Sequence, residues 1–158
     1  MVQSLRKNLS GEKINYECAP HDFNKKGTAS GRLIGGNLSL ITHLLGTSSD
    51  IKTAGKIVFI EDVGEYIYNV DRMLYQLKRA GKLDKIAALI VGGFTEMKDT
   101  VIPFGQTVEE VIRDSVKNYD YPVCFNFPAG HRVENYALKI GVKYKITAGK
   151  MLTTLEEL

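Results

Sequence analysis

The 158-residue chain has few cysteines, no long apolar run and almost no excess of charge of one sign. Its two cysteines, Cys18 and Cys124, are too few for a disulfide framework, so we expect both to be buried free thiols. The net charge of +3 does not favour nucleic acid or an anionic membrane as a partner. No segment approaches the ~18 apolar residues of a membrane-spanning helix, and residues 1–12 lack the apolar stretch of a signal peptide. These absences predict a cytoplasmic protein.

What the sequence does contain is a pattern of alternating strands and helices. Buried strands are predicted where continuous apolar runs occur, at Lys56–Ile60, Ile86–Val91 and Pro122–Phe127. Helical spacing of apolar residues predicts helices at Leu38–Leu45, at Tyr66–Ala80 and after the cap residue Thr107. Shorter strands are expected at Lys13–Cys18, at Arg32–Ile34 and within Ala137–Leu155, and a loop at His21–Gly31. The pattern and length predict one α/β domain.

Two of the buried strands lead into ionisable residues, Glu61 and His131. In an α/β sheet chemistry gathers where strands end, and a carboxylate there can orient an imidazole so that its other nitrogen accepts a proton from a nucleophile. The alternative is that Glu61 and Glu65 are solvated or cap the following helix, and that His131 is an ordinary loop histidine. The residues alone leave both interpretations open.

A nucleophile for such a pair is missing. No Gly-x-Ser-x-Gly motif occurs, and neither cysteine has the helix start or cationic neighbours that lower a thiol pKa. A phosphate-binding Gly-rich loop is also absent, and the three histidines have no metal-ligand spacing, so no metal or organic cofactor is expected. Either the chemistry is not nucleophilic or another part of the molecule carries the nucleophile.

Two further features have both a structural and a functional interpretation. The turn Gly35-Gly36-Asn37 opens a helix and offers backbone N–H groups to a carboxylate or oxyanion, although a tight turn with Asn37 as N-cap explains it equally well. Arg72 follows Asp71 on a predicted helix, where a surface ion pair is the simplest interpretation. Its functional interpretation is a guanidinium that holds an active-site loop or a substrate carboxylate.

Four segments resemble the LD-carboxypeptidase A family, which includes the microcin-immunity serine peptidases: Gly31–Thr47, Lys56–Leu77, Ile90–Phe94 and Phe127–Gly141. The resemblance is to the C-terminal domain only. It implies a three-layer β/β/α swivelling-type domain with mixed sheets and flanking helices at residues 13–158, and a linker remnant at residues 1–12. It also implies a homodimer, and an N-terminal domain, absent here, that carries the nucleophilic serine.

The resemblance implies roles for individual residues. Glu61 and His131 would complete a Ser–His–Glu triad, with Glu65 as the rival acid; Gly36 and Asn37 would line the substrate cleft, and Arg72 would brace the Glu-bearing loop. The substrate would be a muropeptide tetrapeptide that loses its terminal D-Ala in peptidoglycan recycling, and the chain alone would be inactive. Alternatives are an immunity-type peptidase acting on peptidyl-nucleotide antibiotics and a non-catalytic muropeptide-binding module.

Overall fold

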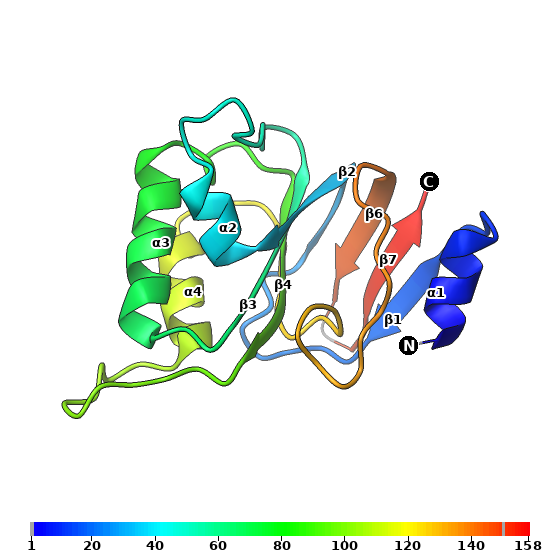
Figure 1. The fold of residues 1–158 in the computed structure, drawn as a ribbon. Coiled ribbons are helices and arrows are strands. Elements are labelled where there is room, and N and C mark those ends of the chain that lie inside the picture. Colours follow the sequence, from blue (N-terminus) through cyan, green and yellow to red (C-terminus); the bar gives the residue numbers. More distant parts are fainter. Residues whose placement is uncertain (1, 150) are drawn as a thin grey trace.

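The computed structural model describes residues 2–149 and 151–158 (Figure 1). Along the chain the elements are α1 (Val2–Leu9), β1 (Asn15–Cys18), β2 (Gly27–Asn37), α2 (Leu38–His43), β3 (Ile57–Val63), α3 (Ile67–Arg79), β4 (Ala88–Thr95), α4 (Val108–Val116), β5 (Val123–Cys124), β6 (Lys143–Ala148) and β7 (Thr153–Glu157). None of the helices in these two ranges is long and apolar enough to cross a membrane. The central alternation of strands and helices confirms the predicted α/β class.

One seven-stranded sheet runs through the molecule in the order β1-β7-β6-β2-β3-β4-β5. Strand β2 belongs to two different pairings. Its first part, Gly27–Arg32, pairs antiparallel with β6, and its second part, Leu33–Asn37, pairs parallel with β3. The strands on one side of β2 are therefore antiparallel, and those on the other side are parallel.

Two apolar cores separate three layers. In β3, Val58 and Ile60 pack with residues of α3 and α4 such as Val70, whereas Ile57 and Phe59 pack with residues of the antiparallel strands. Helices α2, α3 and α4 thus cover one face of the parallel strands, and β1, β6 and β7 lie on the opposite side (Figure 1). This arrangement confirms the predicted β/β/α architecture. Burial on both faces also explains why the first four residues of β3, 57–60, are all apolar.

The helix N-caps predicted from the sequence are confirmed. Asn37 caps α2, its side-chain oxygen accepting from the Leu40 N–H at 3.1 Å. Thr107 and Glu110 form a reciprocal capping box at the start of α4. Helix α3 begins after Tyr66 and ends at Arg79, close to the predicted range.

Several predicted strand ranges are wrong. The loop expected at His21–Gly31 is confirmed only up to residue 26. Its last part and the brief strand after it form one strand over Gly27–Asn37, because this polar segment pairs with the distant β6. Strand β3 does not stop at Ile60 but continues through Glu61 to Val63. Only Val123–Cys124 of the expected third strand pairs along β4. Pairing partners far along the chain decide these limits, and local composition does not encode them.

The two cysteines are free thiols on opposite edge strands of the sheet. Cys124 is buried, as expected, whereas Cys18 is only partly buried. Both side chains nevertheless lie at the same apolar core, and the neighbouring Cys18 thiol together with burial raises the pKa of Cys124. The two edges of the sheet therefore meet across the second core, which shows how strongly the sheet folds over at β2.

Candidate active site

Glu61 lies in the last part of β3, where the pairing with β4 shifts register between Ile60 and Asp62. The irregularity falls at Glu61, and its side chain is only 8% exposed. On the other side, Glu61 is in register with Asn37 of β2. The site is therefore at the carboxyl ends of the parallel strands, as expected for an α/β sheet.

His131 is held over the end of β4 by the turn that follows Phe127. The Gly93 N–H donates to the Ala129 carbonyl at 2.9 Å, and the Thr95 hydroxyl donates to the His131 carbonyl at 2.9 Å. The His131 Nδ1 atom then lies 2.5 Å from Glu61 Oε2. The structure thus joins the two ionisable residues that the sequence singled out, although they are 70 positions apart.

Gly130 makes this approach possible. Its φ of +95° lies in the region that favours glycine, and a Cβ built at this position would be 2.8 Å from the Cβ of Glu61. Any larger residue would both strain the turn and displace the glutamate. The residue before the histidine is therefore a glycine for reasons of space as well as of backbone conformation.

The electrostatics of the pair are those of an oriented base. The hydrogen bond to Glu61 and the charge of that carboxylate raise the pKa of His131 above its usual value. An ionised carboxylate only accepts hydrogen bonds, so the Nδ1 of a neutral ring carries the proton and Nε2 has the lone pair. Within residues 2–149 and 151–158 no group bonds to Nε2, and the histidine side chain is 53% exposed. The arrangement can accept a proton from an external nucleophile.

Asp62, the residue after Glu61, is buried and was not singled out from the sequence. It is 2% exposed, and its carboxylate accepts hydrogen bonds from Asn37 Nδ2 (2.8 Å), from the Ser39 N–H (3.0 Å) and hydroxyl (2.7 Å), and from the Val63 N–H (2.9 Å). Asp62 therefore ties the end of β3 to the start of α2. The sequence signal for Asp62 was the pair of consecutive carboxylates that follows a buried apolar run. The spacing could not predict which groups donate hydrogen bonds to it.

Gly36 and Asn37 were predicted as substrate-binding residues. Both polar ends of the Asn37 side chain are engaged inside the protein, one as the cap of α2 and the other on Asp62. Gly36 has a φ of +148° and open space where a Cβ would be, next to the strand that bears Glu61. Their contact with substrate stays a prediction, while the capping interpretation of Asn37 is confirmed.

Glu65 and Arg72 were predicted to support the loop. Glu65 accepts from Asn69 Nδ2 at 3.0 Å and from the Ser39 hydroxyl at 3.5 Å, and it does not contact His131. The expected ion pair of Arg72 with Asp71 is wrong, because the Arg72 side chain is directed to a different residue. The Arg72 guanidinium lies instead over the Tyr68 ring, 5.0 Å from its centre. Bracing of the loop by Arg72 stays a prediction.

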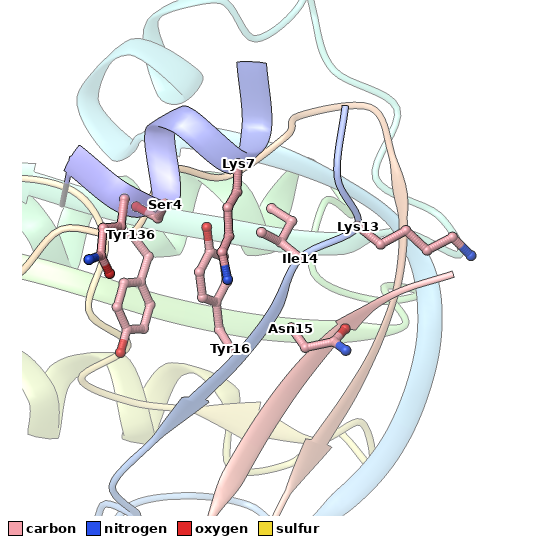
Figure 2. A pocket seen from close by; sticks show the side chains of 8 residues that line it. Ser4, Lys7, Lys13, Ile14, Asn15, Tyr16 and Tyr136 are labelled. Atoms are coloured by element: carbon pink, nitrogen blue, oxygen red, sulfur yellow. The ribbon is translucent and has the colours of Figure 1, made fainter. Parts of the chain in front are cut away.

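A pocket of about 210 Å³ lies apart from this pair, between α1 and β1. Figure 2 shows Lys7 and Tyr16 among its lining side chains, and Tyr16 stacks on Tyr136 with ring centres 4.4 Å apart. Helix α1 belongs to the segment predicted as a linker remnant, and Asn8 fastens it to the Ala137 carbonyl at 2.6 Å. Among the residues that the structure describes, no group of three or more His, Cys, Asp or Glu side chains is arranged to hold a metal.

Comparison with known proteins places this chain in a family. Residues 30–146 match the model of the LD-carboxypeptidase C-terminal domain. The chain is 38% identical over 130 residues to a probable murein peptide carboxypeptidase of Bacillus subtilis (strain 168), covering 82% of this chain and 41% of that protein. It is 32% identical over 126 residues to the Microcin C7 self-immunity protein MccF of Escherichia coli, covering 78% of this chain and 36% of that protein.

A solved structure extends the likeness to the fold. The crystal structure of muramoyltetrapeptide carboxypeptidase from Oxalobacter formigenes matches with a TM-score of 0.89 and 27% identity, over 99% of this chain and 53% of that one. The chain thus spans about half the length of the proteins it matches. On the family match and the identity to the Bacillus subtilis protein, the chain belongs to the LD-carboxypeptidase C-terminal domain family.

Proposed function

We propose that this chain is the C-terminal half of a serine LD-carboxypeptidase and supplies Glu61 and His131 of a Ser–His–Glu triad. The observation that carries the proposal is the 2.5 Å contact between His131 Nδ1 and Glu61 Oε2, with Nε2 left exposed. A purely structural histidine would not need a free ring nitrogen at the carboxyl end of the sheet. The similarity to carboxypeptidases about twice as long supports the same interpretation.

In the proposed mechanism each residue of the triad has a defined step. When a serine hydroxyl of the N-terminal domain attacks the substrate carbonyl, its proton passes to Nε2 of His131. The Glu61 carboxylate stabilises the imidazolium that forms. His131 then donates this proton to the nitrogen of the leaving D-amino acid, which leaves an acyl-enzyme. A water molecule, deprotonated by the same nitrogen, attacks the acyl carbonyl, and the serine recovers its proton.

The proposed substrate is a muropeptide tetrapeptide, from which the enzyme removes the terminal D-Ala during cytoplasmic peptidoglycan recycling. The names of the matched relatives, which include murein peptide and muramoyltetrapeptide carboxypeptidases, support this substrate class. The proposed partners are the serine-bearing N-terminal domain and a second copy in a homodimer. No metal or organic cofactor takes part in the proposed reaction.

The test compares this chain with a protein that also contains the N-terminal domain. The chain alone is expected to release no D-Ala from tetrapeptide, and the longer protein is expected to release it. In the longer protein His131→Ala should abolish turnover, and Glu61→Gln should reduce it far more than Glu65→Gln. Release of D-Ala by the chain alone would refute the split triad, and a larger loss from Glu65→Gln would reverse the assignment of the acid.

A second candidate is an immunity-type peptidase, which the 32% identity to the Microcin C7 self-immunity protein favours. It uses the same triad, so only the substrate distinguishes it. Faster turnover of an aminoacyl sulfamoyl adenosine than of tetrapeptide by the longer protein would establish this alternative. A non-catalytic muropeptide-binding module would instead bind tetrapeptide without cleaving it in either form, which calorimetry and product analysis together would detect.

A further inference from the structure

A second pocket opens at the end of β4, next to the turn that carries His131. It has a volume of about 210 Å³ and is lined by the β4 segment that includes Gly92, Gly93 and Thr95, and by Glu109, Asn126 and Arg132. Sites for drug-sized ligands have volumes of about 300–1,000 Å³, so this pocket suits a smaller group. It touches the candidate active site, because Thr95 bonds to the His131 carbonyl and Arg132 is the next residue in the chain.

The guanidinium of Arg132 is fixed in this pocket with donors to spare. Its side chain lies over Gly93, where a Cβ would overlap it. One of its nitrogens, Nη1, donates to the Asn126 carbonyl at 3.1 Å and to the Asn126 side-chain oxygen. Its remaining N–H groups have no partner in residues 2–149 and 151–158. A guanidinium with one edge held and the other open is well suited to bind a carboxylate.

The second charge in the pocket is Glu109, at the first turn of α4. Its side chain is half-buried and forms neither a hydrogen bond nor an ion pair with any residue that the structure describes. It is not paired with Arg132, although both line the same small pocket. The helix dipole accounts for an acidic residue at this position, but not for an unpaired carboxylate that shares a pocket with an unpaired guanidinium edge.

We propose that this pocket binds the zwitterionic end of an amino acid, with Arg132 on its carboxylate and Glu109 on its ammonium group. One cation and one anion, held apart, complement a group that carries both charges on one carbon. The inference rests on the proposed function and deepens it, because a tetrapeptide can offer such a group at two places. These are the C-terminal residue, which becomes a zwitterion on release, and the far end of a diamino acid that has a second carboxylate.

The test is a binding measurement on this chain alone, which needs no serine. Backbone amide signals of Gly92, Gly93 and Thr95 in a ¹⁵N-labelled sample are followed during titration with D-alanine, D-alaninamide and N-acetyl-D-alanine. D-alanine should bind about fivefold more tightly than either analogue, since each analogue lacks one charge. Equal affinity for the three compounds, or no shift of these signals at millimolar concentrations, would overturn the proposal.

Two variants test which residue binds the carboxylate of D-alanine and which binds its ammonium group. Arg132→Gln should remove the preference for D-alanine over D-alaninamide, and Glu109→Gln should remove the preference over N-acetyl-D-alanine. Arg79→Gln, at the exposed end of α3, is the matched control and should leave both preferences unchanged. Because Glu109 lies on a helix surface and does not contact the His131 turn, its variant keeps the test decisive even if Arg132→Gln disturbs that turn.

Two tetrapeptides distinguish the sources of the zwitterion. They carry either lysine or 2,6-diaminopimelate at the third position, and both end in D-Ala. If the far end of the diamino acid occupies the pocket, the diaminopimelate peptide binds more tightly and both variants erase the difference. If the C-terminal residue occupies it, both peptides bind alike and only Arg132→Gln weakens them.

The outcome separates this proposal from the proposed function. If none of these ligands binds while the longer protein still releases D-Ala, the pocket assignment is wrong and the triad stands. If the pocket binds as described but the longer protein hydrolyses neither tetrapeptide nor an aminoacyl nucleotide, the triad proposal is wrong instead.

Discussion

The parallel and antiparallel parts of the sheet each hold a largely buried glutamate against a basic side chain. In the parallel part Glu61 meets His131, and in the antiparallel part Glu157 of β7 meets Lys139, with Nζ 3.0 Å from Oε2. The lysine pair is enclosed, with side-chain exposures of 19% and 11%, whereas the histidine is 53% exposed. Similar contacts are thus built into very different surroundings.

The hydrogen bonds around the Lys139–Glu157 pair show why its side chains are enclosed. The Ile14 N–H also donates to Glu157, and Lys139 also donates to the Glu12 carbonyl, so this pair fastens the N-terminal segment to β7. Lysine stays charged near neutral pH and has no lone pair to offer. The histidine pair leaves one nitrogen open, and the hydrogen bond to Glu61 raises the pKa of the His131 ring above its usual value. Only the pair at the carboxyl ends of the parallel strands is therefore equipped to move a proton.

The largest loss of stability is expected on substitution of Gly130, because the contact between Glu61 and His131 depends on this glycine. Gly130→Ala should destabilise the chain by about 2–4 kcal/mol, because it adds both left-handed backbone strain and a steric clash with Glu61. The displaced carboxylate should also let the pKa of His131 fall back toward its ordinary value. Urea unfolding and an NMR titration of the histidine ring measure the two effects.

Gly141→Ala is the matched control for that substitution. Gly141 has a similar φ of +87°, but nothing lies within 4 Å of a Cβ built there. The control should cost only the backbone strain, about 1–2 kcal/mol, and leave the His131 titration unchanged. Equal losses of stability in the two variants, or an unmoved His131 titration in Gly130→Ala, would show that the glycine does not set the glutamate–histidine contact.

The next largest effect is expected at Asp62, the buried carboxylate that follows Glu61 in β3. Asp62→Asn should destabilise the chain by about 1–3 kcal/mol, because the new amide cannot accept all four hydrogen bonds and turns a donor toward other donors. Asp22→Asn, an exposed site, is the control and should change the free energy of unfolding little. A neutral result for Asp62→Asn would mean that the carboxylate is not needed to tie β3 to α2.

The smallest effects distinguish the two pairs by their pH dependence. Burial acts to raise the pKa of Glu157, but Lys139 and the Ile14 N–H lower it more, and the pKa falls below its ordinary value. Glu157→Gln should therefore cost about 1 kcal/mol above ~pH 4.3, a cost that shrinks as acid protonates the wild-type carboxylate. It should leave the His131 titration unchanged.

Glu61→Gln should show the opposite dependence. Because the pKa of His131 is raised in the folded chain, the charge-dependent stabilisation is fully present below ~pH 6.5 and is lost as the pH rises through the raised value. The variant should thus lose stability on the acidic side only, and its His131 should titrate at lower pH than in the wild type. Identical pH profiles for the two glutamine variants would abolish the distinction between the pairs.

The sequence allowed much of the parallel part to be predicted. The apolar runs of β3 and β4, the helical spacing of α3 and the caps Asn37 and Thr107 are local signals, and the structure agrees with them. The antiparallel part was harder, because Gly27–Arg32 is polar and becomes a strand only through β6, more than a hundred positions away. Partners at such distances leave no trace in local composition.

The candidate site shows the same division. The sequence by itself determined that an acid and a histidine follow buried strands, that a glycine precedes the histidine, and that a family resemblance exists. Only the tertiary structure decided that Glu61 rather than Glu65 meets His131, and that Asp62 is fully hydrogen-bonded. Only the structure also places Arg132 and Glu109 in one pocket, with no ion pair between them among the described residues. The reason is physical: residue types and local spacing are written in the chain, whereas contacts between side chains depend on how distant strands pair and where the sheet bends.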